Sequence, residues 1–300
     1  MLSRNVMNNG SNGRPRGRLA GPDMRGDRAT MKKKASRNPL ARSFQILRYL
    51  LRSSEDAIGL RRIATDLKMA PSSVHRLLAG LVEEGLIKQI DDAGHYSVSL
   101  EMVRLAHMAA HRLPLHKVAL PHLRELVAAT KETALVGAYD PLRHEMMFVA
   151  VAESNQPLRY VNRMLEWMPI YAGASGLAIM AFLPEAERRE IVARTHLAPI
   201  TDRTITEPYK LEHQLELIRE RHYACSVGQR TPGAVAIGAP IFGPSGDVVG
   251  DAIITLPEQR FDPASEKHLA RHVMNCADRI TRQMGGVKPS LFENKMEEVS

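Results

Sequence analysis

The sequence lacks the features of secreted, membrane and cysteine-dependent proteins. Its 300 residues include two cysteines, Cys225 and Cys276, which form no paired-spacing motif, so we expect neither a disulfide framework nor a cysteine metal site. The longest apolar run, residues 146–152, is far too short to span a bilayer. The pattern of a signal peptide, a charged segment followed by an apolar one, is not found at the start. These absences predict a cytoplasmic protein.

Charge is present but unevenly distributed. The formal net charge is +8, and residues 1–42 alone hold 11 Lys and Arg against 2 Asp. This segment is rich in Gly, Asn and Arg and poor in large apolar residues, so it cannot bury enough surface to fold alone. We interpret it as a disordered basic arm, either a solubilising tail or a flexible contact to DNA phosphates. A third alternative is that Met24 or Met31 is the true first residue.

After the arm, apolar spacing predicts three helices. SFQILRYLLRS places Phe44, Leu47 and Leu51 on one side of the first helix. A second, short helix is predicted in GLRRIATDLK. Pro71 suits the first position of the third helix, where its missing N–H has no cost. Gly85 ends that helix because it can adopt a left-handed conformation.

A hairpin follows the three helices. LIKQI and HYSVS are short β-prone runs that flank DDAG, a turn sequence containing Asp and Gly. The order helix, helix, tight turn, helix, hairpin predicts a winged helix-turn-helix over residues 43–99.

The outer face of the third helix favours DNA recognition over an ordinary solvated surface. Ser72, Ser73, His75 and Arg76 crowd its first turn and a half, whereas two glutamates at 83–84 lie at the far end. A recognition helix needs short donors for phosphates and a longer donor for base edges near its N-terminus. Arg can donate two hydrogen bonds to guanine. A plain surface helix remains the alternative.

These residues resemble the IclR family of bacterial transcriptional regulators over nearly the whole ordered chain. SSVHRLLAGLVEEGLI is similar to the family's recognition helix, LRRIATDLKMA to the element before it, and YSVSLEMVRLA to the exit from the wing. YAGASGLAIMAFLPEAERREIV, RTITEPYKLEHQLELIRERHYA and GAVAIGAPIFGPSGDVVGDAIITLPEQRF follow the family's effector domain in order. The resemblance implies a DNA-binding regulator that responds to a ligand.

The resemblance also assigns DNA contacts, with one departure. Many members have a lysine where this chain has Pro71, which removes one phosphate contact. The expected DNA-binding residues are the four polar residues of the third helix, two arginines at the start of the second, and two residues of the wing: Ser72, Ser73, His75, Arg76, Arg61, Arg62, Lys88 and His95. For the two wing residues, a merely solvated side chain is an equal alternative.

The second half of the chain predicts an α+β domain. β-prone TALVGAYD and MMFVAVAES, and later GAVAIGAPIF and DVVGDAIITL around PSG, alternate with helical segments near 115–131, 175–194, 208–222 and 262–283. Segregated helices and an antiparallel sheet suit an α+β fold better than a doubly wound parallel sheet. The resemblance implies a GAF-like effector domain over residues 114–285.

In the family, this domain holds a small molecule, often a carboxylate, in a pocket at the end of the sheet. Carried over by motif, Gly173 and Ala174 would form the floor, where backbone N–H groups can hold an anion. Four residues would line the other side and three would cover the pocket: Ala234, Ala236, Ile253 and Thr255, then Met164, Trp167 and Met168. Because Thr255 is the one hydroxyl among these matched positions, we expect a mainly apolar pocket for a larger or aromatic acid.

Catalytic and metal-binding alternatives have weaker support. GASG resembles the G-x-S-x-G elbow but is one residue short, which argues against Ser175 as a nucleophile. HMAAH has the His spacing of a zinc helix without its Glu. His268, His272 and Cys276 share one helix face, but apolar neighbours there suggest that Cys276 is buried. We predict no cofactor, no metal and no enzymatic activity.

The sequence therefore predicts five segments. They are a basic arm (1–42), a winged helix-turn-helix (43–99), a linker helix (100–113), an effector domain (114–285) and a tail (286–300). We expect a dimer or tetramer that binds double-stranded operator DNA and a small acid, and acts as a repressor. The alternative is a ligand-binding protein or esterase-like enzyme that retains an unused helix-turn-helix.

Overall fold

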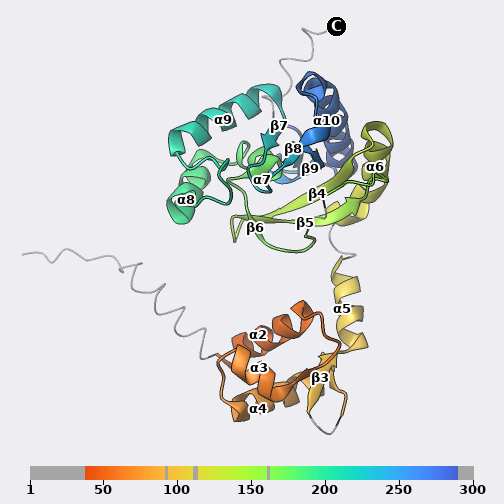
Figure 1. Ribbon diagram of the computed structural model, residues 1–300, viewed down its shortest axis with the longest axis vertical. Coiled ribbons are helices and arrows are strands. Elements are labelled where there is room, and N and C mark those ends of the chain that lie inside the picture. Colours follow the sequence, from red (N-terminus) through yellow and green to blue (C-terminus); the bar gives the residue numbers. More distant parts are fainter. Residues whose placement is uncertain (1–37, 92–93, 111–113, 161–162, 290–300) are drawn as a thin grey trace, which may run out of the picture. The chain divides into compact units, whose positions relative to one another are not determined.

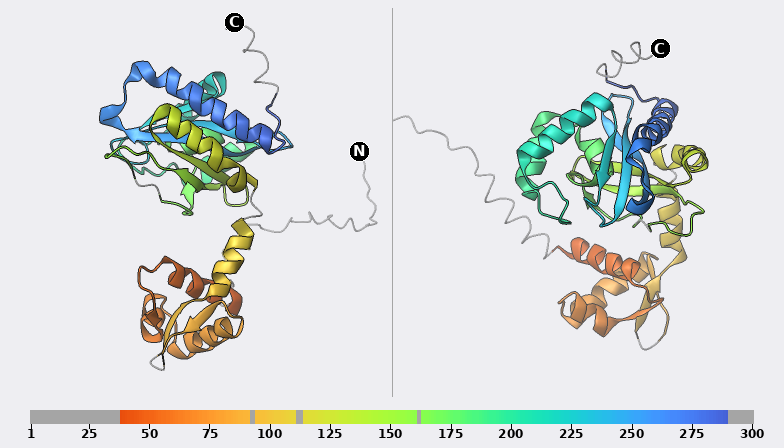
Figure 2. Two further views of the ribbon diagram at one scale, coloured as in Figure 1. Left: turned by 90° about the vertical axis from the view of Figure 1, so that its right-hand side faces the viewer. Right: turned by 45° about the horizontal axis from the view of Figure 1, so that its top comes forward.

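The computed structural model describes residues 38–91, 94–110, 114–160 and 163–289. The chain forms two compact units, Met1–Ala106 and His107–Ser300 (Figures 1 and 2). Among the described helices, none is both long and apolar enough to cross a membrane.

Three helices form most of the first unit: α2 (Pro39–Arg52), α3 (Leu60–Asp66) and α4 (Pro71–Glu83). Helix α2 begins four residues before residue 43, the predicted start of the winged helix-turn-helix. The Asn38 side chain caps it by accepting a hydrogen bond from the Leu40 N–H, and Pro39 occupies the first helical position. Gly85, just after α4, has a φ of +69°, which confirms the left-handed conformation predicted there.

A three-stranded sheet completes the unit. The predicted hairpin is present as β2 (Ile87–Gln89) and β3 (His95–Val98), and the sequence pattern missed β1 (Ile58–Gly59), which pairs with the other side of β3. Two residues are too few to show a periodicity. Ile46, Ile63, Val74 and Leu78 are fully buried between helices and sheet, so the winged helix-turn-helix has a core of its own.

Helix α5 (Leu100–Ala110) follows the wing. Several of its large apolar side chains are exposed in the single chain, notably Leu100 (86%), Val103 (59%) and Met108 (47%). Apolar side chains at this density on one helix are a mark of an interaction surface.

The second unit is built on a six-stranded antiparallel sheet in the order β6-β5-β4-β9-β8-β7. Its strands are β4 (Thr133–Asp140), β5 (Glu145–Ala152), β6 (Met168–Pro169), β7 (Ala224–Val227), β8 (Ala234–Phe242) and β9 (Val248–Pro257). The helices are α6 (Pro114–Thr130), α7 (Gly173–Met180), α8 (Glu185–Thr195), α9 (Pro208–Arg221) and α10 (Glu266–Gln283). The predicted α+β class with an antiparallel sheet is confirmed.

Alternating side chains give this sheet a separate core on each face. On β9, Ile254 packs in the cluster with α6 and α10, whereas Ile253 packs in the cluster with α7 and α9. Figure 1 shows α6 and α10 on one side of the sheet and α7, α8 and α9 on the other. Every residue of α7 is buried, so this helix is the centre of the second layer.

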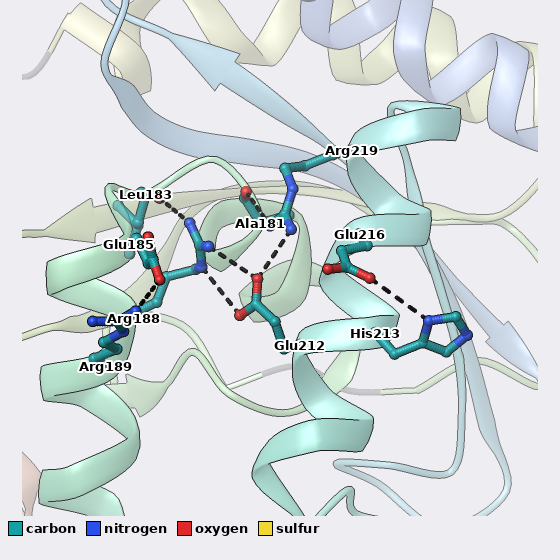
Figure 3. A network of polar contacts seen from close by, with 9 residues as sticks. All are labelled: Ala181, Leu183, Glu185, Arg188, Arg189, Glu212, His213, Glu216 and Arg219. Atoms are coloured by element: carbon teal, nitrogen blue, oxygen red, sulfur yellow. Dashed lines mark hydrogen bonds and ion pairs between the residues drawn. The ribbon is translucent and has the colours of Figure 1, made fainter.

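An ion-pair network joins α8 to α9 (Figure 3). Arg188 donates to Glu212 at 2.9 Å, Arg219 donates to the same carboxylate at 3.0 Å, and both guanidinium groups also donate to backbone carbonyls near the end of α7. Although burial opposes the shift, these two arginines hold the pKa of Glu212 below its ordinary value. The charges of Arg188, Glu212 and Arg219 between the two helices are therefore paired within the protein.

We expect Gly176→Ala to destabilise the second unit. An added Cβ would lie 2.5 Å from the Ile170 backbone oxygen, and overpacking of this kind costs about 1–3 kcal/mol. Gly80→Ala is the contrasting variant, because a Cβ there meets nothing within 4 Å and Ala gains about 0.5–1 kcal/mol over Gly in a helix. Urea unfolding followed by Trp167 fluorescence measures the stability of the second unit, and circular dichroism follows the unfolding of both units. Equal stability of Gly176→Ala and the wild type would contradict this packing.

Candidate DNA-binding surface and ligand pocket

Helix α4 has one buried and one exposed face. Val74, Leu77, Leu78 and Leu81 are buried against the rest of the unit. On the other face, Ser72, His75 and Arg76 are exposed and Ser73 is half-buried. Within the described part of the chain, no side-chain hydrogen bond or ion pair engages these four polar residues. Their donors are free for a partner.

The start of α4 adds backbone donors to this surface. Pro71 occupies the first position and the preceding Ala70 offers no side-chain cap. The positive end of the helix dipole is therefore not neutralised by a side chain, which favours an approaching phosphate.

The two arginines predicted to contact phosphates differ in their surroundings. Arg61 and Arg62 are both exposed. Arg62 donates to both carboxylate oxygens of Glu55, at 2.6 and 2.9 Å, and lies 3.8 Å from Asp66. For Arg61, no such partner is found among the described residues. Arg62 is therefore engaged in an ion pair within its own unit. The sequence did not predict this pair, because Glu55 and Arg62 are seven residues apart.

The two wing residues differ in the same way. Lys88 is exposed on β2. The His95 ring lies with Nδ1 2.9 Å from Asp91 Oδ2, and the His95 backbone N–H donates to the same carboxylate. His95 therefore holds the base of the wing, whose residues 92 and 93 lie outside the described ranges.

A pocket opens at the end of the sheet in the second unit, between α7 and the strands β8 and β9. Its cavity volume is about 50 Å³, well below the roughly 300–1,000 Å³ of typical small-molecule sites. Six of the nine residues expected there line it: Gly173, Ala174, Ala234, Ala236, Ile253 and Thr255.

The three residues expected to cover the pocket lie elsewhere. Met164 forms a bridge to Phe148 and packs against the core, and Met168 is a residue of β6. Trp167 is 36% exposed, with the Arg143 guanidinium 4.8 Å from its ring centre. None of the three is a lining residue, although Phe148 is one.

The backbone N–H groups of the pocket floor already have acceptors. Gly173 N–H donates to Gln229 Oε1 at 3.2 Å, and Ala174 N–H donates to Ser226 Oγ at 2.8 Å. An anion would have to displace these side chains to use the two groups assigned to it from the sequence.

A guanidinium group supplies the positive charge instead. Arg230, in the loop between β7 and β8, lines the pocket. Its Nη2 donates to the Pro169 carbonyl at 2.6 Å and to the Ala172 carbonyl. Within the described residues these bonds leave Nε and Nη1 for a ligand. Burial lowers the pKa of Arg230 to about 10, so the group stays charged at neutral pH.

The close approach of Arg230 explains a glycine of the floor. Gly173 has a φ of +76°, and a Cβ added to it would lie 3.1 Å from Arg230 Nε. The glycine of YAGASG is therefore needed for both its conformation and its small size.

The pocket is more polar than the matched positions suggested. Ser175, Ser226, Gln229 and Thr231 line it in addition to Thr255, while Leu135 and Phe148 provide apolar walls. Sequence reasoning missed most of these polar residues and Arg230 because they lie in or beside the loop SVGQRTPG, which has no periodicity.

Ser175 is placed for hydrogen bonding within the protein. It is 3% exposed, and its Oγ donates to Asp251 Oδ1 at 2.7 Å. Nucleophilic catalysis requires a base in contact with the hydroxyl. In the described part of the chain, the side chains that the Ser175 hydroxyl contacts are Asp251 and Met146, neither of them a histidine.

His268 and His272 lie on α10 and line neither site. His107 lies on α5, and His111 is outside the described residues. The rings of His268 and His272 pack edge to face at 4.8 Å, and Cys276 is buried as predicted. Among the described residues, no group of three or more His, Cys, Asp or Glu is placed to hold a metal ion.

Comparison with known proteins gives matches to both units. The family profile described as bacterial transcriptional regulator IclR C-terminal matches residues 107–282, and the IclR helix-turn-helix domain matches residues 39–91. The HTH-type transcriptional regulator KipR of Bacillus subtilis is 30% identical over 76% of this chain and 90% of its own length. BhcR of Paracoccus denitrificans is 30% identical over 90% and 92%.

One solved structure shows the shared fold. An IclR homolog from Microbacterium hydrocarbonoxydans, complexed with 4-hydroxybenzoate, has a TM-score of 0.71 and 21% identity, covering 82% of this chain and 99% of that chain. At this identity the likeness extends to the fold alone.

We expect Arg76→Ala to lose the preference for one DNA site over random DNA, at a cost of about 1–3 kcal/mol, because a base-reading donor is removed. Arg62→Ala removes the same charge from the same unit, but its guanidinium is engaged by Glu55, so the preference should remain. Fluorescence anisotropy on DNA flanking the protein's own gene, at several salt concentrations, compares the two. Retained preference in Arg76→Ala would count against α4 as the reading element.

Proposed function

Because this chain belongs to the IclR family of bacterial transcriptional regulators, we propose that it binds operator DNA and that a small organic acid, held at Arg230, changes its affinity for that DNA. The observation that carries the second half of this proposal is a charged guanidinium group lining a small pocket. A carboxylate is the ligand group that matches a guanidinium in both charge and geometry.

On the DNA side, Ser72, Ser73, His75 and Arg76 read the major groove from α4. Arg61 and Lys88 contact phosphates, since both are exposed cations without a described partner. Arg62 and His95 support this surface from within, through Glu55 and Asp91. Phosphate contacts give affinity and register, whereas Arg76 supplies the sequence preference.

On the ligand side, Arg230 binds the carboxylate. The hydroxyl and amide groups around it, those of Ser226, Gln229, Thr231 and Thr255, orient the rest of the molecule. Leu135 and Phe148 pack against its apolar part. A small acid with both polar and apolar portions matches the chemistry of this lining.

The regulator acts in the cytoplasm as a repressor, and the acid shifts the population between forms of high and low operator affinity. The alternative is a ligand-binding or esterase-like protein with an unused helix-turn-helix. The esterase-like alternative has less support. The Ser175 hydroxyl donates to the carboxylate of Asp251, which is buried, and not to a histidine that could act as its general base.

The regulator is a homodimer or a tetramer built from such dimers. Support for the dimer comes from α5, where Leu100, Val103 and Met108 are exposed in the single chain. A dimer would place two copies of α4 on the two halves of a pseudo-palindromic operator.

Arg230→Gln should weaken binding of the effective acid by at least about 30-fold, since removing one member of a buried charge pair costs about 2–5 kcal/mol. Isothermal titration calorimetry with propionate, benzoate and 4-hydroxybenzoate tests this. Arg203→Gln is the charge-matched control, because Arg203 pairs with Glu258 on the surface. Operator binding without acid should persist in both variants. Unchanged acid affinity in Arg230→Gln, with its fold intact, would refute the assignment.

Val103→Asp should convert the dimer to monomers at micromolar concentration, because a charge on an apolar contact surface must be desolvated on association. Arg104→Ala on the same helix, where Arg104 pairs with Glu101, should leave the dimer intact. Light scattering measures the mass, and operator binding should weaken together with it. A monomeric wild type, or a dimeric Val103→Asp protein, would exclude α5 as the interface.

A further inference from the structure

Asp251 is a carboxylate buried directly beneath the ligand pocket. It is 0% exposed and lies on β9. Side chains at every second residue of a strand share one face, and Ile253 and Thr255, two and four residues further along, line the pocket. Asp251 therefore lies on the same face of β9 as these two pocket residues, and it is further from the pocket than Ile253.

The surrounding strands are shaped to accept this carboxyl group. Gly137 lies opposite Asp251 on β4, and a Cβ added there would be 2.3 Å from Asp251 Oδ1. Gly238 on β8 is similarly close, with its added Cβ 3.3 Å from Oδ2. Both neighbouring strands thus have a glycine beside the carboxyl group. A side chain at Gly137 or Gly238 would occupy the space that the carboxyl group fills.

The carboxyl group is incompletely satisfied. Oδ1 accepts the hydrogen bond from Ser175, a residue of the pocket floor, whereas Oδ2 is buried with no hydrogen-bond partner. A buried polar atom without a partner is costly and calls for an explanation.

The charged group that acts on Asp251 is Arg230, the residue assigned to the ligand. The other groups around Asp251 are uncharged. They are the Ser175 hydroxyl on α7, the Gly137 backbone on β4, the Met146 thioether on β5, which contacts Ser175, and Gly238 on β8. Burial raises the pKa of Asp251 to about 7, and Ser175 and Arg230 oppose that rise. Among the described residues around Asp251, Arg230 is therefore the one cation, and it acts on a carboxyl group with a pKa of about 7.

A bound acid competes for the same cation. Its carboxylate at Arg230 would bring a second negative charge into a site where like charges cannot both be stabilised. We propose that Asp251 is a further functional residue of this pocket, which takes up one proton from solvent when an acid binds at Arg230, so that the acid is bound together with a proton. Asp251 becomes neutral, and Arg230 is left to the ligand.

This inference rests on the proposed role of Arg230 and extends it to regulation. A carboxyl group whose pKa rises on ligand binding makes the affinity depend on pH between its free and bound pKa values. Above about pH 7, the affinity for the acid should fall by about tenfold per pH unit, and below that value it should level off. The regulator would then respond most strongly when the acid accumulates and the pH falls.

The experiment is calorimetric titration with benzoate, propionate and 4-hydroxybenzoate at pH 8 in two buffers of different ionisation enthalpy, neither of them a carboxylate. The dependence of the heat on the buffer gives the number of protons taken up. We expect about one proton per acid in the wild type. Asp251→Asn should take up none, show no change of affinity from pH 6 to 9, and bind the acid more tightly than the wild type at pH 8.5.

Ser175→Ala provides a second variant in case Asp251→Asn does not fold. It keeps the carboxyl group but removes the donor that holds the pKa of Asp251 down, so the pH at which affinity begins to fall should move upward. Circular dichroism establishes that each variant is folded.

The outcomes separate the two proposals. If an acid binds in a manner that depends on Arg230, but the wild type takes up no proton and has the pH profile of Asp251→Asn, the inference on Asp251 is wrong and the effector site stands. If none of the three acids binds the wild type, or Arg230→Gln binds them equally well, the effector site fails and the inference fails with it.

Discussion

The ligand pocket depends on one constraint, the placement of a guanidinium group inside the protein. Arg230 can stay charged there because the Pro169 and Ala172 carbonyls accept its hydrogen bonds and because Asp251 lies close enough to act on it electrostatically. Gly173 has no side chain where the guanidinium passes. A cation that is fixed in this way, and still faces a cavity, favours an anionic ligand over a neutral one.

The winged helix-turn-helix meets a different constraint, since α4 must bury one face while leaving the other unengaged. Four aliphatic residues fix the helix in the core. Other polar groups of the unit are engaged internally, as Arg62 is by Glu55 and His95 is by Asp91. Against this background, the free donors of His75 and Arg76 are a distinct surface, and its residue types match those that read base edges.

Most of the fold follows from local patterns, and the exceptions are short elements. The long strands β8 and β9 and the helix α4 have enough residues to show their periodicity. The edge strands β6 and β7 and the two-residue β1 do not, because their position depends on partners distant in the sequence. The pocket residues follow the same division. Six of the lining residues lie in motifs of helices and strands and were predicted, whereas Arg230 and Gln229 lie in a loop and were not. Trp167 was predicted to cover the pocket, but its ring packs on Arg143.

The sequence by itself determined the two units and the two faces of α4, because apolar periodicity is a local property that the hydrophobic effect acts on directly. The wall residues of the pocket were predicted from motifs that resemble the family's effector domain. Only the tertiary structure decided which charges meet. Ser175 and Asp251 are 76 residues apart in the sequence and 2.7 Å apart between their oxygens, and Arg230 reaches the same site from a third segment. Electrostatic pairing acts through space, so its partners are defined only once the sheet and α7 have brought these segments together.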